Sequence, residues 1–266
     1  MYTPITILSL ALGLAAAAPT NNYLAKANTT VPPVTAASTP ASSPQPGPSA
    51  ACPPKASAKD LALFEKLTSA PNANIRQSYL SDADYVFDFK NKCDTEGFIA
   101  SGKGGEVVRA DRASMPALVG QGGAVAIGFL GPCGFNTPHV HPRAAELNLV
   151  VEGSLFASVT AENGARHMSH TLTQWQMTVF PAGAMHTEFN PDCTPSTFVA
   201  SFPHEDPGVG QIAQEFFGLE NEIVKGSAGG ELSIEGADID KFRKLVPANV
   251  AAGVDSCLIK CGISKR

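Results

Sequence analysis

The sequence predicts a mainly β, single-domain barrel with short α-helices before and after it. Short apolar or alternating runs, separated by Gly, Pro, Asn and Asp, extend from about residue 85 to residue 202. Apolar residues at helical spacing occur on both sides of this region, and no internal repeat is present. Many short strands at regular spacing with turn residues between them are typical of a β-sandwich or barrel.

The first 58 residues are expected to lie outside this domain. Residues 5–18 form an apolar run of 14 that ends in small residues. The run is too short to span a bilayer and is typical of a signal peptide over residues 1–18, the alternative being a buried N-terminal helix. We therefore expect a secreted protein of the extracellular space or cell wall.

Residues 19–58 predict a disordered linker. They hold nine Pro, ten Ser or Thr and nine Ala in 40 positions, with no acidic residue. Such a segment has too few large apolar groups to offset the entropy lost on ordering. It contains one N-glycosylation sequon at Asn28, and the alternative is that this sequon is not used.

The folded part is predicted to begin with a helix over residues 59–70, where Leu61, Phe64 and Leu67 share one face. The predicted strands then follow in order at residues 106–110, 123–130, 138–141, 147–153, 155–160, 170–174, 177–181, 185–189 and 196–202. Helical patterns return at residues 211–217, 237–246 and 249–261. These elements predict a domain over residues 59–225, with its core at about 80–225, and a cysteine-containing helical extension over residues 226–266.

Charge and hydropathy exclude two classes of partner. The 19 Lys and Arg against 24 Asp and Glu give a net charge of −5, whereas a binder of phosphate backbones needs a basic surface. No second apolar run is long enough to cross a membrane, and the tail is too polar for a lipid-anchor signal. We expect neither a nucleic-acid nor a membrane partner.

Three of the six histidines lie in two short segments of the strand region. His139 and His141 are two residues apart in a predicted strand and therefore point to the same face. Glu146 lies five residues after His141, so in an unbroken strand it would point to the opposite face. Pro142 breaks the strand, and Glu146 can then point into the barrel from the next strand. A Pro-x-Gly turn before His186 brings that histidine to the start of another strand.

Three neutral imidazoles and one carboxylate suit a divalent first-row metal ion. An octahedral ion with four protein ligands keeps two positions free, and its remaining positive charge attracts an anion. A His-x-His pair alone is more often a surface pair on an edge strand, but the complete set favours a metal site. The other three histidines, His167, His170 and His204, are expected at the surface.

These segments resemble the two motifs of the type-1 cupins, G-x5-H-x-H-x3,4-E-x6-G and G-x5-P-x-G-x2-H-x3-N. His141-Pro142-Arg143-Ala144 also resembles the germin and germin-like branch. The linker and the cysteine-containing tail are similar to fungal and slime-mould spherulin-type relatives. The resemblance covers roughly residues 80–225. Cys133 and Trp175 replace the first glycine of each motif, which puts the turn geometry and the shape of the barrel mouth in question.

The resemblance implies a cupin β jelly-roll in which His139, His141, Glu146 and His186 bind the metal. Manganese is the usual ion, with Fe, Zn, Co and Ni left open. The implied activity is a Mn-dependent oxidoreductase on a small anion, oxalate or superoxide. The alternative is a spherulin-like, non-enzymatic structural metalloprotein of the extracellular space, cell wall, spore or cyst. A sugar- or hormone-binding cupin is a third reading, and the resemblance also implies a homo-oligomer, a dimer or a trimer of dimers.

Asn136 and Glu188 are the candidates for catalysis. Asn136 stands where oxalate-oxidising germins carry an asparagine that reaches the substrate, the alternative being a turn residue. Ala126 replaces a second asparagine of those germins and counts against oxalate chemistry. Glu188 shares the face of His186 and is a candidate acid or base. Asn148 is interpreted either as support for a ligand or as a structural residue facing the barrel interior.

Six cysteines in a secreted chain favour disulfides. Cupin topology implies that His139 and His186 lie on neighbouring antiparallel strands, where paired positions have a constant index sum. Cys133 and Cys193 fall within one residue of that sum, so we expect them to be bonded. The other four, Cys52, Cys93, Cys257 and Cys261, allow three pairings; bonds from Cys257 and Cys261 to Cys52 and Cys93 are one possibility, and a local pairing or free thiols is another.

Overall fold

The computed structural model describes residues 60–95, 97–227 and 244–264, without the side chains of residues 92 and 93. The predicted signal peptide, the linker, Asn28, Cys52 and most of the predicted helix at 237–246 lie outside the described residues. The described residues belong to one compact unit, Ala51–Arg266.

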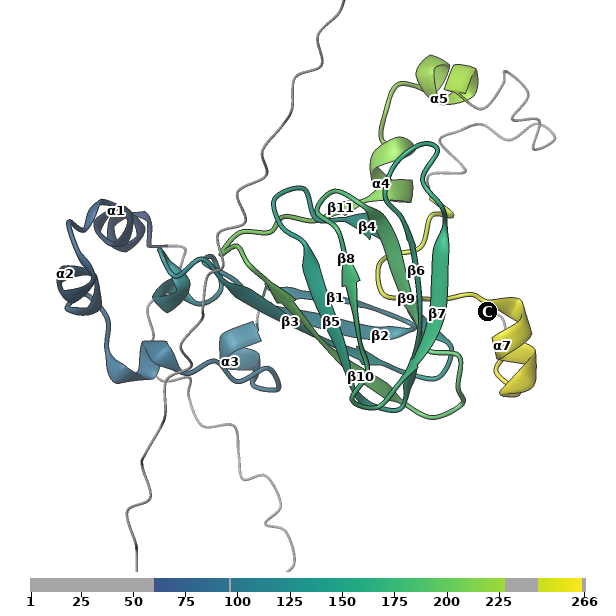
Figure 1. Cartoon of the computed structure of the whole chain (residues 1–266), viewed down its shortest axis with the longest axis horizontal. Helices are drawn as coiled ribbons and strands as arrows, with labels where there is room; N and C mark the ends of the chain where they lie inside the picture. The colour runs from purple at the N-terminus through teal and green to yellow at the C-terminus, as the bar shows by residue number, and fades with distance from the viewer. Residues whose placement is uncertain (1–59, 96, 228–243, 265–266) are drawn as a thin grey trace, which may run out of the picture. The chain divides into compact units, whose positions relative to one another are not determined.

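Two antiparallel sheets form the barrel (Figure 1). The first has the order β1 (Ile99–Gly102), β2 (Gly105–Ala110), β3 (Ala124–Leu130), β10 (Ser196–Phe202), β5 (Glu146–Glu152), β8 (Met177–Phe180). The second has the order β11 (Gly210–Gln211), β4 (Gly134–Val140), β9 (Met185–Phe189), β6 (Ser154–Thr160), β7 (Met168–Thr173), and β12 (Ala251–Ala252) also pairs with β4. The mainly β jelly-roll is confirmed, and each of the nine predicted segments overlaps a strand.

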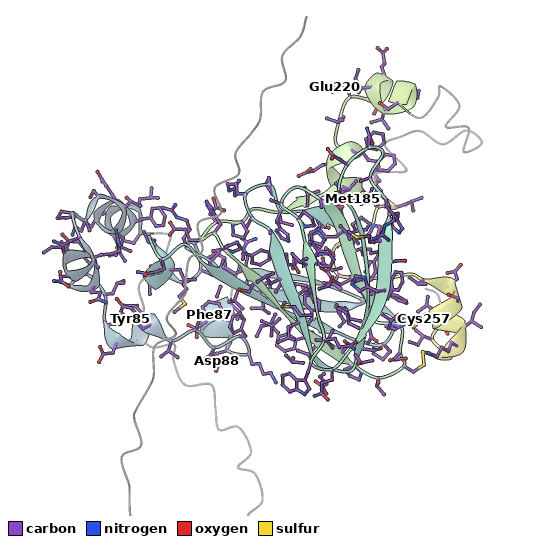
Figure 2. All side chains as sticks on the ribbon, in the orientation of Figure 1. Tyr85, Phe87, Asp88, Met185, Glu220 and Cys257 are labelled. Carbon is purple, nitrogen blue, oxygen red and sulfur yellow. A yellow bond between two sulfur atoms is a disulfide. The ribbon has the colours of Figure 1, made fainter. Side chains whose placement is uncertain are left out.

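Alternation along the strands places the core between the sheets. In β3 every second residue is buried, and β6 shows the same period. Side chains from both sheets fill the space between them (Figure 2). The core includes Val150, Leu155, Phe180 and Phe198. Gly128 is required on β3, because a Cβ there would lie 2.1 Å from a ring carbon of Phe198.

Short helices flank the barrel. Before it and at its entry come α1 (Leu61–Ser69), α2 (Ala73–Gln77), η1 (Asp82–Tyr85), α3 (Lys92–Thr95) and η2 (Pro116–Leu118); after it come α4 (Ile212–Phe216), α5 (Asn221–Ser227) and α7 (Asp255–Lys260). Helix α1 begins where the Asp60 side chain accepts the Leu63 N–H at 3.1 Å. The helices predicted at 59–70 and 211–217 are confirmed. Within the described ranges, no helix is long and apolar enough to cross a membrane.

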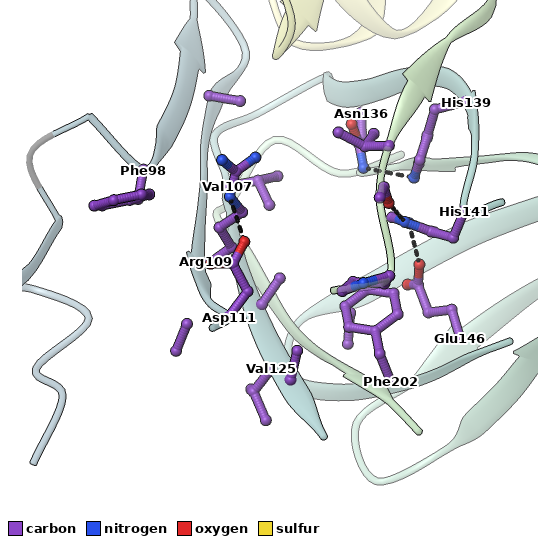
Figure 3. A pocket seen from close by; sticks show the side chains of 18 of the residues that line it. Phe98, Val107, Arg109, Asp111, Val125, Asn136, His139, His141, Glu146 and Phe202 are labelled. Carbon is purple, nitrogen blue, oxygen red and sulfur yellow. Dashed lines mark hydrogen bonds and ion pairs between the residues drawn. The ribbon is translucent and has the colours of Figure 1, made fainter. Parts of the chain in front are cut away.

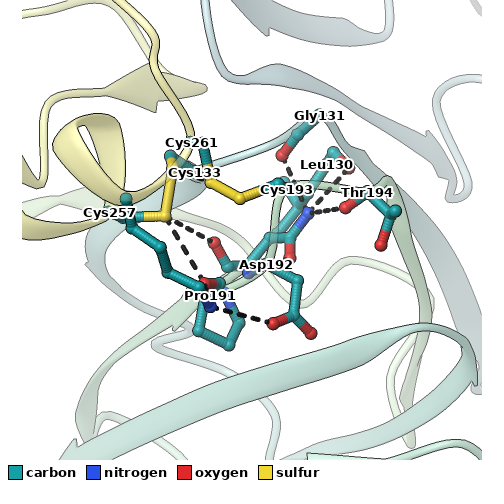
Figure 4. The surroundings of a disulfide bond; sticks show 11 residues. Leu130, Gly131, Cys133, Pro191, Asp192, Cys193, Thr194, Cys257 and Cys261 are labelled. Atoms are coloured by element: carbon teal, nitrogen blue, oxygen red, sulfur yellow. Dashed lines mark hydrogen bonds and ion pairs between the residues drawn. A yellow bond between two sulfur atoms is a disulfide. The ribbon is translucent and has the colours of Figure 1, made fainter.

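The described disulfides join Cys133 to Cys257 and Cys193 to Cys261 (Figure 4). The predicted Cys133–Cys193 bond is wrong, and so are bonds from the tail to Cys52 and Cys93. The register argument did place the two backbones together, since the Cys133 N–H donates to the Asp192 carbonyl at 3.3 Å. An index sum does not fix the direction of a side chain, however, and Cys257 and Cys261, one turn apart at the end of the chain, reach these two sulfurs instead.

Cys133 and Trp175 keep the turns of the glycines that they replace. Their φ angles are 58° and 67°, in the left-handed region that glycine enters most easily. Trp175 is 70% exposed in the turn between β7 and β8. Its backbone N–H donates to the Val150 carbonyl at 2.8 Å, toward the opposite end of β5 from Glu146. Trp175 therefore adopts a backbone conformation typical of glycine, and it does not line the cavity described below.

Candidate metal centre

Three strands and one loop bring the four predicted ligands together. His139 lies on β4 directly opposite His186 on β9. His141 follows the end of β4, and Glu146 is the first residue of β5. The strand does end before Pro142, which is why Glu146 faces the histidines despite its parity. All four side chains are buried.

The ligand atoms converge on one point. One nitrogen from each imidazole and one oxygen from the carboxylate all lie within 4.8 Å of one another. Glu146 Oε2 is 3.0 Å from Nε2 of His141 and 3.2 Å from Nε2 of His186. This compact set of three nitrogens and one oxygen is the donor set that the sequence predicts for a divalent ion.

Backbone carbonyls fix the protonation of the rings. Nδ1 of His139 donates to the Thr137 carbonyl at 2.9 Å, and Nδ1 of His186 donates to the Ala184 carbonyl at 2.8 Å. Nδ1 of His141 donates to the Gly208 carbonyl at 2.5 Å. Because a carbonyl only accepts, each Nδ1 carries the hydrogen and each Nε2 keeps a lone pair for a metal ion. The residues present therefore fit a metal.

Arg143 holds the loop that orients His141. Its Nε donates to the Asp206 carbonyl at 2.7 Å, and its Nη2 contacts Asp206 Oδ1 at 2.6 Å. The backbone N–H of Arg143 donates to the Pro207 carbonyl at 3.2 Å. The arginine of the germin-like His-Pro-Arg-Ala segment thus fixes the backbone next to Gly208.

The shifted pKa values of His139 and Glu146 favour the protonation states in which these side chains bind a metal ion. Burial, followed by the neighbouring His186, lowers the pKa of His139 from its usual 6.5 to about 3. Burial alone would raise the pKa of Glu146, but the Nε2 atoms of His141 and His186, which donate to its carboxylate whenever these rings are protonated, hold it well below its usual value. His139 is therefore neutral and Glu146 ionised at neutral pH, as ligation requires.

The fully buried Asn148 supports a ligand. Its Nδ2 donates to Glu146 Oε1 at 2.9 Å, which leaves Oε2 facing His141 and His186. Phe180 stacks on the His186 ring with centroids 4.2 Å apart. Of the two interpretations of Asn148, support for a ligand is the one that the contacts favour.

Asn136 and Glu188 belong to one buried chain of hydrogen bonds. Asn136 Nδ2 donates to Glu188 Oε2 at 3.0 Å and lies 3.4 Å from His139 Nε2. Asn136 Oδ1 accepts from Nδ2 of Asn249 at 2.7 Å. Burial and the charge of Glu146 raise the pKa of Glu188 well above its usual value, against the Asn136 hydrogen bond. Asn249 carries no local sequence signal, so sequence reasoning missed it.

A cavity of about 310 Å³ opens onto the centre (Figure 3). His139, His141, Glu146 and Asn136 line it together with Ala126, Phe198, Ala200, Phe202, Arg109 and Asn249. Glu188 is not among the lining residues. Asn136 is thus placed to touch a bound molecule, whereas Glu188 reaches it only through Asn136.

The other three histidines lie apart from the centre. His167 is exposed and contacts Ser158 and Thr160. The half-buried His170 contacts Thr178, and the half-buried His204 accepts the Asp206 N–H. None of the three joins the cluster of ligand atoms found among the described residues.

Comparison with known proteins places the chain in a family. A family model described as Cupin matches residues 92–236. Spherulin-1A of Physarum polycephalum is 39% identical over 203 residues, covering 76% of this chain and 80% of that protein. Germin-like protein 3-5 of Oryza sativa subsp. japonica is 34% identical over 146 residues, covering 54% of this chain and 64% of that protein.

A solved structure of oxalate oxidase, described in connection with that enzyme's mechanism, has the same fold. It superposes with a TM-score of 0.52 at 24% identity, over 62% of this chain and 84% of that one. The resemblance found in the two histidine motifs is confirmed, and this chain belongs to the cupin family, with spherulins and germin-like proteins among its relatives.

Proposed function

We propose that this cupin is a secreted metalloprotein that holds Mn²⁺ through His139, His141, Glu146 and His186 and oxidises or dismutates a small anion. The observation that carries the proposal is the cavity of about 310 Å³ that reaches three of the four ligands. A purely structural metal site is normally closed by its ligands, whereas a catalytic one keeps a position open to a reactant. The ligand set has room for such a position.

The donor atoms limit which metal ions can bind, but they do not select a single one. Imidazole nitrogens and a carboxylate oxygen accept Mn, Fe, Co, Ni or Zn, and manganese is preferred from the germin resemblance. When bound, a redox-active dication supplies electron exchange and a net positive charge, since Glu146 contributes the one ligand charge. The protein supplies the Nε2 atoms of the three histidines, held in place by backbone carbonyls, and a largely apolar cavity wall.

The proposed role of Asn136 is to contact the anion. Its amide lines the cavity, and two hydrogen bonds, to Glu188 and from Asn249, hold its orientation. Glu188 was predicted as a possible acid or base, and its place behind the lining supports a positioning role through Asn136 instead. Oxalate is one candidate substrate: one oxalate dianion, one dioxygen and two protons give two carbon dioxide and one hydrogen peroxide. Superoxide is the second: two superoxide anions and two protons give dioxygen and hydrogen peroxide.

The test is an assay of the full chain purified from its own host, with metal content measured on the same sample. We expect manganese, and peroxide release from oxalate or accelerated loss of superoxide. His139→Ala should abolish the activity, whereas His167→Ala, which removes an exposed histidine outside the cluster, should leave it intact. Absence of both activities in metal-loaded protein would reject the enzymatic proposal.

A non-enzymatic, spherulin-like role is the second candidate. Two observations favour it: the 39% identity with Spherulin-1A, and Ala126 in the cavity wall where oxalate-oxidising germins carry an asparagine. In this case the metal stabilises the barrel, because a ligand that binds only the native state adds stability by mass action. Chelation would then lower the melting temperature of a protein that has no activity to lose.

Export and assembly complete the proposal. Export rests on the apolar run at residues 5–18, and N-terminal sequencing of mature protein should show it removed. A homo-oligomer, a dimer or a trimer of dimers, rests on the germin resemblance, and light scattering measures it directly.

A further inference from the structure

Arg109 places a cationic side chain in the cavity of the metal centre. On β2 it pairs with Ala126 of β3, which in turn pairs with Ala200 of β10, so these three residues form one row across the sheet. All three line the cavity. The two alanines fill little of the space beside the arginine. Figure 3 shows Arg109 across the pocket from His141 and Glu146.

The guanidinium of Arg109 is held in one orientation, but not all of its N–H donors have an acceptor among the described residues. Its Nε contacts Asp111 Oδ2 at 2.9 Å, and Asp111 is itself held by the N–H groups of Ala113 and Ser114 on Oδ1 at 2.8 and 3.0 Å. The Phe98 ring lies 5.8 Å from the guanidinium carbon. Neither terminal nitrogen hydrogen-bonds another residue of the described chain, and the side chain is 46% exposed. A fork of N–H donors is therefore held in place and left free to bind.

The charges around this cavity are few. Besides Arg109 they are Asp111, which holds it, Asp206, which is paired with Arg143, and the ligand Glu146. The wall between Arg109 and the ligands is largely apolar, with Val107, Ala124, Ala126, Phe198, Ala200 and Phe202. With a dication at the ligands, the cavity has one cation at each end of an apolar wall.

We propose that Arg109 is a second anion anchor, which binds one carboxylate of a short dicarboxylate whose other carboxylate lies at the metal centre. A guanidinium presents two parallel N–H donors in the geometry that a carboxylate accepts. A volume of about 310 Å³ lies at the low end of small-molecule pockets, so a short dicarboxylate fits. The inference rests on the metal binding in the proposed function, not on its redox activity.

The test is calorimetric titration of the metal-loaded full chain with oxalate, malonate, succinate and acetate. At least one dicarboxylate should bind more tightly than acetate. Arg109→Gln should weaken that dicarboxylate about tenfold to a hundredfold, the usual range for a charge-assisted hydrogen bond, and leave acetate unchanged. Arg109→Lys keeps the charge without the fork and should recover only part of the loss. The matched control is Arg166→Gln, which removes an exposed arginine and should change the affinity for neither the dicarboxylate nor acetate.

Metal content is measured for every variant first, so that loss of metal, which would count against the proposed function, is separated from loss of the anion anchor. If no dicarboxylate binds more tightly than acetate, the proposal fails. It also fails if Arg109→Gln leaves the margin between dicarboxylate and acetate unchanged. If Arg109→Gln does not fold, the same comparison is made with Arg109→Lys, and the proposal fails if this variant leaves the difference in affinity between dicarboxylate and acetate unchanged.

Discussion

Asn249 offers the sharpest test of how the C-terminal segment completes the centre. This half-buried side chain accepts the Thr137 N–H at 2.8 Å and the Thr137 hydroxyl at 3.3 Å, and it donates to Asn136 Oδ1 at 2.7 Å. Asn249→Ala removes all three hydrogen bonds. The Thr137 hydroxyl keeps its contact with Gln211, but the Thr137 backbone N–H loses the Asn249 acceptor.

The expected cost follows from these contacts. A buried N–H without a partner costs about 1–3 kcal/mol, and loss of the amide hydrogen bond to Asn136 adds about 1 kcal/mol. Asn249→Ala should therefore lower the free energy of unfolding by about 2–4 kcal/mol. In a domain of this size that corresponds to a drop in melting temperature of roughly 5–15 °C.

Two further variants separate the contributions. Asn249→Asp keeps the Oδ1 that accepts from both Thr137 donors but turns a second oxygen toward Asn136 Oδ1, so it should lose about 1–2 kcal/mol. Asn163→Ala, at an exposed position in the turn after β6, is the matched control and should stay within about 0.5 kcal/mol of the wild type.

Urea and thermal unfolding of metal-loaded protein provide the measurement. An Asn249→Ala variant as stable as the control would refute the argument that Asn249 carries the Thr137 and Asn136 hydrogen bonds. A variant that loses stability while Asn249→Asp loses still more would show instead that repulsion at Asn136 outweighs the unpaired N–H.

Three further predictions concern the metal, the disulfides and the left-handed turn. In metal-free protein, the unfolded chain takes up a proton at His139 that the native state refuses, which lowers the free energy of unfolding by about 2 kcal/mol between pH 6.5 and pH 5, whereas the raised pKa of Glu188 acts with the opposite sign over the same range. Urea titrations at the two pH values should therefore show a steeper fall in Glu188→Gln than in the wild type, and bound metal should reduce the fall. Peptide mapping of unreduced protein should recover Cys133 with Cys257, and replacing both by Ser should cost up to about 5 kcal/mol, since the bond closes a long loop; a Cys133–Cys193 peptide would contradict the structure. Trp175→Gly should be more stable than Trp175→Ala by about 1 kcal/mol, because alanine keeps the strain of the positive φ and glycine does not, and the opposite order in thermal melts would rule out a left-handed Trp175.

The strands and the ligands were predictable because their signals are local. Alternation with a period of two identifies β3 and β6 from seven residues each. His139 and His141 share a face by their spacing, and Pro142 marks the break that returns Glu146 to that face. The strands β1, β11 and β12 were missed, because four exposed residues or two residues give no period.

The sequence by itself thus predicted the barrel and the four candidate ligands, and it left the turns at Cys133 and Trp175 open until the structure gave their φ angles. Only the tertiary structure decided the disulfide partners, the carbonyl of Gly208 behind His141, the amide of Asn249 behind Asn136 and the place of Arg109 across the cavity. Each of these joins residues far apart in the chain through the direction of a single side chain or carbonyl. Periodicity constrains which face a residue occupies, but the partner on that face depends on how the sheets, the loop at residues 206–208 and the C-terminal segment pack together.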